Sequence, residues 1–158
     1  MNKTIQPFNH STIFELLEKV TDPEIPVIPI RDLGILRGVE IENDLINIII
    51  TPTYSGCPAM MEIEKNINNT LKSEGIENFK ITTILSPPWT TEWMTEDGKR
   101  KLKEYGIAPP NPTNEDDIQC PNCGSQNTNL VSQFGSTACK SLFKCDDCLE
   151  PFDYFKCH

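Results

Sequence analysis

The chain has 158 residues, of which 37% are hydrophobic, and this length provides one ordinary domain and a small second unit. Its formal net charge is −9, and residues 113–158 alone carry 3 basic and 7 acidic side chains, which disfavours nucleic-acid binding because phosphates require a basic surface. No apolar stretch approaches the roughly 18 residues of a membrane span, and residues 1–6 lack the apolar core of a secretion signal, so we expect a cytoplasmic protein that binds no membrane.

Hydrophobic periodicity predicts an α+β domain over residues 1–106, with the element order α-β-β-α-β-α. The expected elements are a helix from about Thr12 to Asp22, strands at about 34–42 and 44–51, a helix from about Pro58 to Gly75, a strand at 79–85 and a helix at 95–104. Thr12 and Glu15 have the spacing of a capping box at the start of the first helix. The prolines in residues 24–31 predict an irregular loop, and a tight turn is expected at residues 43–44.

The last third of the chain is predicted to be a linker followed by a small metal-binding unit. Residues 107–117 contain three prolines and an acidic end without apolar periodicity, which is typical of a linker. Residues 118–158 are predicted to form a small β zinc ribbon, with a hairpin between 128–134 and 140–144. Its few large apolar side chains are those of Phe152, Tyr154 and Phe155. Because so thin a core does not fold alone, metal binding is expected to supply folding energy.

Four of the seven cysteines form two C-x-x-C pairs, Cys120 with Cys123 and Cys145 with Cys148, separated by 21 residues. Thiols in a chain without an export signal indicate a reducing compartment, where they bind metal or take part in chemistry. Two cysteines three apart in a tight turn direct both sulfurs at one ion, so two such turns complete a tetrahedral shell. We therefore expect a structural Zn²⁺ site formed by these four side chains. A pair of disulfides and an iron–sulfur cluster are the alternatives.

Cys57 stands apart from these pairs, at the junction between the second predicted strand and the helix that follows it. Unpaired N–H groups at a helix entry stabilise an anion, so we expect this thiol to be more acidic than a free cysteine and to serve as nucleophile, redox centre or soft-metal ligand. Thr53 and Ser55 offer hydroxyls to the same pocket. An inert, buried cysteine that fills the turn is an equal alternative. His10 and His158 are not placed for a Cys–His pair.

Several motifs together resemble known families. The metal–sulfur cluster assembly-factor family, whose small α+β domains help to install iron–sulfur clusters in other proteins, has motifs similar to Asp22-Pro-Glu-Ile-Pro26, Ile30-Arg-Asp-Leu-Gly-Ile35 and Thr51-Pro-Thr-Tyr-Ser-Gly-Cys-Pro58. PaaD-type members of this family, from bacterial phenylacetate degradation and with an appended ribbon, have motifs similar to residues 86–94, 105–110, 134–140 and 150–157. The resemblance covers nearly the whole chain from about Ser11 onward.

The resemblance implies an accessory factor for iron–sulfur cluster maturation or delivery that serves the multicomponent phenylacetyl-CoA epoxidase of aerobic phenylacetate catabolism. It places the functional thiol at Cys57 and a supporting loop at Asp22 to Glu24, with iron or an iron–sulfur cluster bound transiently. The implied partner is an iron–sulfur client protein, the reductase component of the epoxidase. Because one sulfur cannot satisfy a cluster, a homodimer or client cysteines are expected to add ligands. A structural component that bridges oxygenase and reductase is the alternative.

A catalytic role is not expected from the motifs. The sequence contains no Glu-x-x-His set for a di-iron centre and no Gly-x-Gly-x-x-Gly fingerprint. Cys139 and Cys157 exceed the four ligands that one zinc needs, and they form either a second, labile site with Cys57 or His158, or packed thiols. We favour packed thiols, because a shell of four thiolates is already closed.

Two other features allow two interpretations each. Trp89 and Trp93 either form a surface for docking a partner or include one ring that covers the edge of the sheet. The basic run at residues 99–103 is either a solvated helix face or a docking patch, and its acidic neighbours favour the solvated face.

Overall fold

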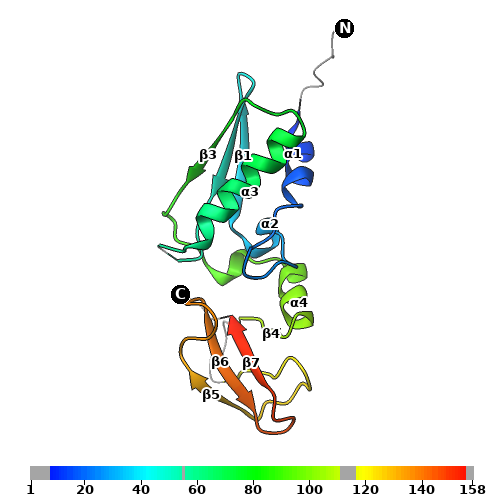
Figure 1. Ribbon diagram of the computed structural model, residues 1–158, viewed down its shortest axis with the longest axis vertical. Helices are drawn as coiled ribbons and strands as arrows, with labels where there is room; N and C mark the ends of the chain where they lie inside the picture. Colours follow the sequence, from blue (N-terminus) through cyan, green and yellow to red (C-terminus); the bar gives the residue numbers. More distant parts are fainter. Residues whose placement is uncertain (1–7, 55, 111–116, 156–158) are drawn as a thin grey trace.

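The computed structural model describes residues 8–54, 56–110 and 117–155, and it has an α+β architecture with two sheets. Figure 1 shows a first unit in which helices cover a three-stranded sheet, and below it a second unit built on a four-stranded sheet. The chain passes from one unit to the other through α4 (Glu96–Glu104) and β4 (Ile107–Ala108). No helix in the described ranges is long and apolar enough to cross a membrane.

The sheet of the first unit has the order β1-β2-β3. β1 (Leu36–Glu42) and β2 (Leu45–Ile50) are antiparallel, and β3 (Phe79–Thr83) runs parallel to β2. The predicted tight turn joins β1 to β2, with Asn43 and Asp44 at φ values of 50° and 65°, as the twist of a two-residue hairpin requires. Alternate residues of β2 are buried, namely Ile46, Ile48 and Ile50, so this side of the strand faces the core.

Helices α1 (His10–Leu17) and α3 (Ala59–Ser73) pack over this buried face. α3 begins directly after Pro58, as predicted, because a first helical turn does not need the N–H that proline lacks. Its residues at helical spacing are fully buried, namely Ile63, Ile67 and Leu71. Gly75, with a φ of 81°, ends the helix in the left-handed conformation that glycine accepts without strain.

Two local predictions in the first unit are wrong. Helix α1 begins at His10, because the side chain of Asn9 accepts a hydrogen bond from the backbone N–H of Thr12 and caps the helix. The predicted capping box of Thr12 and Glu15 therefore does not start the helix. The region expected to be an irregular loop ends in the short helix α2 (Ile30–Leu33), whose N-cap is Pro29. A 3₁₀ turn, η1 (Thr91–Trp93), also precedes α4.

The second unit has the sheet order β4-β7-β6-β5. The predicted hairpin is present as β5 (Thr128–Ser132) and β6 (Lys140–Cys145). A further strand beyond the prediction, β7 (Pro151–Phe155), pairs with β6. β4 lies in the segment predicted as a linker, and its two residues pair in parallel with β7. Residues 111–116 of that segment lie outside the described residues.

Apolar contacts join the two units. Phe155 of β7 is buried in the same cluster as the core of the first unit, and its ring meets Trp89 edge to face at a centroid distance of 5.9 Å. The indole N–H of Trp89 donates to the carbonyl oxygen of Leu33 at 3.0 Å. Trp89 is therefore buried at the junction and is not available as a docking surface.

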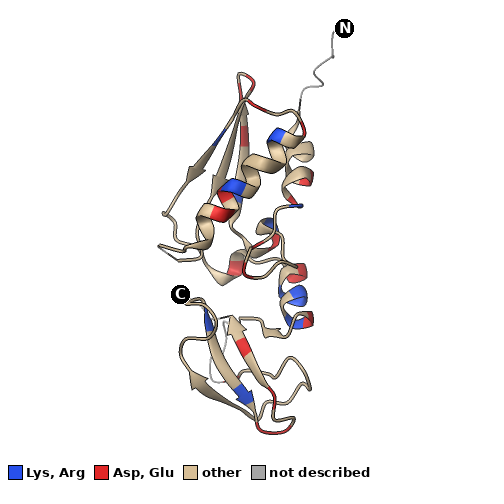
Figure 2. Ribbon diagram, viewed as in Figure 1, with Lys and Arg blue, Asp and Glu red and all other residues tan. Residues whose placement is uncertain are grey.

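α4 carries acidic side chains at both ends and basic ones between them (Figure 2). Arg100 pairs with Glu104 at 2.9 Å, and Lys101 pairs with Asp32 of α2 at 2.7 Å. The basic run at residues 99–103 is thus balanced by neighbouring carboxylates, as expected for a solvated helix face.

Gly34 and Gly38 provide a matched test of how closely η1 packs against Gly34 at the end of α2. Gly34 has a φ of +82°, and a Cβ there would lie 2.7 Å from Cβ of Trp93 and 2.8 Å from its carbonyl oxygen, whereas a Cβ at Gly38 would meet nothing within 4 Å. We expect Gly34→Ala to lower the free energy of unfolding by at least about 2 kcal/mol, because the strain of an alanine at positive φ adds to the steric overlap of its Cβ with Trp93. Gly38→Ala should change it by less than about 0.5 kcal/mol in the same urea titration. Equal effects would contradict the close approach of η1 to Gly34.

Candidate metal and thiol sites

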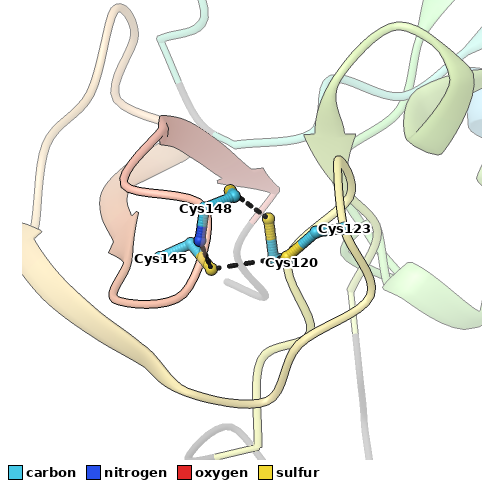
Figure 3. A group of neighbouring side chains, drawn as sticks. All are labelled: Cys120, Cys123, Cys145 and Cys148. Carbon is cyan, nitrogen blue, oxygen red and sulfur yellow. Dashed lines mark hydrogen bonds between the residues drawn. The ribbon is translucent and has the colours of Figure 1, made fainter.

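The four cysteines of the predicted metal site lie together between two turns of the second unit (Figure 3). Cys120 and Cys123 precede β5, Cys145 is the last residue of β6, and Cys148 lies in the turn to β7. All four sulfurs lie within 4.8 Å of one another. The Sγ atoms of Cys120 and Cys148 are 3.8 Å apart, and those of Cys123 and Cys145 are 3.6 Å apart.

These separations fit one tetrahedrally coordinated ion. With metal–sulfur bonds of about 2.3 Å, the edges of a tetrahedron measure about 3.8 Å. A disulfide requires a sulfur–sulfur distance of about 2.05 Å, so the disulfide alternative is wrong and the four thiols are free. A multinuclear iron–sulfur cluster distributes its cysteine ligands over separate iron atoms, which sets their sulfurs further apart. The donor set therefore closes the shell of a single ion.

The two turns share a left-handed backbone conformation at the residue that follows each pair of cysteines. Gly124 and Leu149, each directly after the second cysteine of a pair, have left-handed φ values of 79° and 64°. In the second turn the backbone N–H of Cys148 donates to Sγ of Cys145 at 3.5 Å. Hydrogen bonds from the backbone of Cys148 and Asp147 lower the pKa of Cys145 to about 7. These hydrogen bonds thus favour the thiolate form of Cys145, the form that binds a metal ion.

Cys57 lies in the loop between β2 and α3, and its side chain is half-buried. Its backbone N–H donates to the carbonyl oxygen of Tyr54 at 3.3 Å, and its thiol is hydrogen-bonded to the Tyr54 hydroxyl. Thr53 is buried in the same loop. Ser55 lies outside the described residues.

The Asp22–Glu24 loop lies near this thiol. Asp22 is buried, and its Oδ1 accepts hydrogen bonds from the backbone N–H groups of Glu24 at 2.7 Å and Ile25 at 3.1 Å, so it shapes the loop. Burial raises the pKa of both carboxyl groups, and the charge of Asp22 adds to the effect on Glu24. Both carboxylates also act on Cys57 through space. The structure therefore brings the two predicted parts of the site together.

The expectation that Cys57 is unusually acidic is wrong. Burial raises the pKa of the Cys57 thiol, and the negative charges of Glu24 and Asp22 raise it further. The backbone N–H of Ala59 donates to the sulfur at the helix entry and lowers the pKa, but this effect is the smaller one. At neutral pH the thiol is therefore protonated, and a metal ion must displace the proton.

The structure adds Tyr54 to the surroundings of Cys57 and Lys140 to those of Asp22 and Glu24. Tyr54 is adjacent in the loop, so the motif alone could have indicated it. Cys139 and Lys140 come from the second unit, where both are buried at the start of β6. Lys140 is remote from residues 22–24 in sequence, so only the packing of the two units reveals that it acts on Asp22 and Glu24. Cys139 is already one of the thiols that the sequence offers for a second site. Cys157 and His158 lie outside the described residues.

Known proteins are similar to each unit and to the whole. Residues 10–83 match the iron-sulfur cluster assembly protein family, and residues 109–156 match the PaaD zinc beta ribbon domain. A protein of Escherichia coli (strain K12), described as a putative component of 1,2-phenylacetyl-CoA epoxidase, is 45% identical over 159 residues, which cover 98% of this chain and 96% of that protein.

Two further relatives cover slightly more than half of this chain. The "Fe-S protein maturation auxiliary factor SufT" of Staphylococcus aureus (strain USA300) is 28% identical over 85 residues, which cover 52% of this chain and 96% of that protein. The crystal structure of a domain of unknown function, DUF59, from Bacillus anthracis superposes with a TM-score of 0.55 and 27% identity, over 59% of this chain and 90% of the other.

Cys145→Ser tests the four-sulfur site. We expect this variant to lose most of the one equivalent of tightly bound metal, because three thiolates leave an open position and weaken the shell. Elemental analysis after gel filtration measures the loss. Cys139→Ser is the matched control, since Cys139 is buried but does not belong to the four-sulfur group, and it should retain the metal. Equal metal content in the two variants would contradict this assignment.

The raised pKa of Cys57 predicts slow alkylation at neutral pH. The rate of iodoacetamide labelling should still be rising above about pH 8.5, the ordinary pKa of a thiol. Glu24→Gln removes a negative charge that raises this pKa, so it should speed labelling at about pH 8. Glu42→Gln, at the end of β1, is the control and should leave the rate unchanged. Peptide mass spectrometry follows Cys57 alone, and a rate that levels off below pH 8 would refute the assignment.

Proposed function

The chain belongs to the PaaD family, and on this premise we propose that it is an accessory factor for iron–sulfur cluster maturation or delivery in the phenylacetyl-CoA epoxidase system. The relatives are named as a component of that epoxidase and as an auxiliary factor of Fe–S protein maturation. The proposal joins the two descriptions: the first unit handles iron or a cluster, and the epoxidase system supplies the client.

The observation that carries the proposal is the state of the Cys57 thiol. A delivery factor must hold its cargo and then release it, so its ligands should bind reversibly. Cys57 is half-buried beside two carboxylates that raise its pKa, so protons compete with the metal at neutral pH. A partly accessible, protonated thiol suits transfer better than a closed thiolate shell does.

The ribbon has the opposite character, and we propose that it binds Zn²⁺ permanently. Four thiols at tetrahedral separations leave no open position for substrate or exchange. Zinc has no redox chemistry, so it suits a structural role next to iron cargo. Both kinds of thiol site require reduced cysteines, and we accordingly assign the protein to the reducing cytoplasm.

One thiol cannot supply all the ligands of a cluster, since each iron takes thiolates of its own. We propose that a homodimer or cysteines of the client add the missing ligands during transfer. The proposed client is the iron–sulfur reductase component of the epoxidase. No catalytic step is assigned to this chain, because its sequence lacks Glu-x-x-His ligand sets and nucleotide-binding fingerprints.

The Escherichia coli relative is described as a part of the epoxidase itself, which favours a second function, that of a structural component bridging oxygenase and reductase. In this case Cys57 is inert. The protein would then co-purify stoichiometrically with the enzyme and be required even when every other component already carries its cofactors.

Cys57→Ser separates the two functions. We expect the variant to keep its fold and its ribbon metal but to leave the reductase component short of iron, because serine is a poor ligand for iron–sulfur clusters. Iron and acid-labile sulfide are measured in the reductase purified from cells that express each variant.

Met61→Ser is the matched control, because Met61 lies one turn further along α3 with its side chain exposed. The control should yield a reductase with its full iron content. A full cluster complement with Cys57→Ser, together with a requirement for the protein among mature components, would replace the delivery role by the bridging role.

A further inference from the structure

The two cysteine turns of the ribbon are joined by more than their sulfurs. The first turn (residues 120–123) and the second turn (residues 145–148) face each other across the four-sulfur group (Figure 3). Polar side chains next to the sulfurs form hydrogen bonds between the second turn and the segment that follows the first. These side chains belong to Ser125, Asn127, Asn129, Asp146 and Asp147.

Asp147 lies between the two cysteines of the second turn and accepts hydrogen bonds from two residues that follow the first turn. The hydroxyl of Ser125 donates to its Oδ2, and the side-chain amide of Asn127 donates to its Oδ1 at 3.4 Å. Both carboxylate oxygens therefore point toward the same segment. Two donors to one carboxylate fix its direction as well as its distance.

Ser125 connects the backbone of the first turn to this carboxylate. Its carbonyl oxygen accepts a hydrogen bond from the backbone N–H of Cys120 at 2.8 Å, which closes the first turn. Its hydroxyl accepts from the backbone N–H of Asn127 at 3.0 Å and donates to Asp147. Because the hydroxyl is used as both donor and acceptor, its orientation is set.

A second pair of hydrogen bonds lies beside this one. The backbone N–H of Asp146 donates to the carbonyl oxygen of Asn127 at 2.9 Å, and the side-chain amide of Asn129 donates to Oδ2 of Asp146. The side-chain hydrogen bonds between the turns are exposed to solvent, so each alone contributes little to stability. Together they hold the second turn at two neighbouring residues.

We propose that Ser125 and Asp147 are positioning residues of the four-sulfur site, and that their hydrogen bond slows the loss of the metal ion by keeping the two turns together. This inference rests on the proposal that the ribbon binds Zn²⁺ permanently. Neither residue is a ligand, since the metal-capable group in the described part of the chain consists of the four cysteines.

The sulfur pairs show why the spacing of the turns matters. Sγ of Cys120 lies 3.8 Å from Sγ of Cys148, and Sγ of Cys123 lies 3.6 Å from Sγ of Cys145, so each close pair joins one turn to the other. An ion in a closed shell leaves only after sulfurs detach from it. Hydrogen bonds between the turns keep a detached sulfur near the ion, so it binds again before the other bonds break. Residues that orient metal ligands typically change metal affinity by about 10–100-fold.

Ser125→Ala tests the proposal, because it removes the hydroxyl without changing a charge or a ligand. We expect Zn²⁺ to leave this variant of the full chain about tenfold faster than it leaves the unaltered protein. The absorbance of a chromogenic chelator in excess measures the rate of release. Ser125→Thr keeps a hydroxyl at this position and should restore slow release.

Ser136→Ala is the matched control within the same ribbon. The hydroxyl of Ser136 donates to Oδ2 of Asp153 at 3.3 Å, which is a serine–aspartate contact of the same kind that joins no cysteine turn. This variant should release Zn²⁺ as slowly as the unaltered protein. Equally fast release from Ser125→Ala and Ser136→Ala would mean that any loosening of the ribbon frees the ion, which overturns the positioning role.

Asp147→Asn and Asp153→Asn form a second pair, in which each variant loses one negative charge. We expect only Asp147→Asn to speed release, because only Asp147 accepts hydrogen bonds across the two turns. Faster release from both would assign the effect to the charge of the ribbon and would contradict the role of the hydrogen bond.

Cobalt-loaded protein distinguishes a positioning residue from a ligand. Thiolate–cobalt charge-transfer absorbance reports how many sulfurs bind the ion, and the ligand-field bands report its tetrahedral geometry. Ser125→Ala should keep the full charge-transfer intensity although it releases the ion faster. A reduced intensity would mean that sulfurs no longer bind the ion, so the residue would act on the fold of the ribbon and not on the spacing of its turns.

Two outcomes separate this proposal from the zinc site on which it rests. Slow release from the unaltered protein, with equally slow release from Ser125→Ala and Asp147→Asn, overturns the positioning role and leaves the permanent site intact. Fast release from the unaltered protein itself removes the permanent site and, with it, the present inference.

Discussion

Everything that the second unit contributes depends on four sulfurs meeting at one point. The ribbon has few large buried side chains, among them Phe152, which stacks on Phe143, and Tyr154, whose ring meets Phe143 edge to face. A core of this size does not offset the conformational entropy of some 40 residues, so we expect an ion held by the four sulfurs to supply folding free energy. The same sheet presents Phe155 and Lys140 to the first unit, so on this expectation the junction would depend indirectly on metal binding.

The cysteines of this chain lie in two different electrostatic surroundings. At the four-sulfur site, backbone N–H groups point at Cys145 and favour its thiolate. At Cys57, burial and carboxylates outweigh the single N–H of Ala59 and favour the thiol. At each cysteine, the free-energy difference between the thiol and the thiolate form decides how strongly protons compete with a metal ion. A permanent site and an exchangeable one can therefore coexist on one chain without different ligand atoms.

Features that depend on local spacing could be predicted from the sequence. The alternation of isoleucines in β2, the helical spacing in α3 and the paired C-x-x-C turns each indicate their geometry within a few residues. Features that depend on competition or packing could not. Asn9 and Thr12 are both good capping residues, and only the structure shows which one is used. The pKa of Cys57 depends on burial and on a loop from elsewhere in the chain, so the helix-entry argument alone predicts the wrong sign.

The pairing of β4 with β7 has a consequence for dissecting this protein. Ile107 and Ala108 follow α4 almost directly, yet they form the outermost strand of the ribbon's sheet. A ribbon excised after them would expose the backbone of β7 along a bare edge, and bare edges recruit strands from other molecules. Self-association of such a fragment would then reflect the cut, not the natural assembly. Fragments intended for spectroscopy should therefore retain α4 with the ribbon.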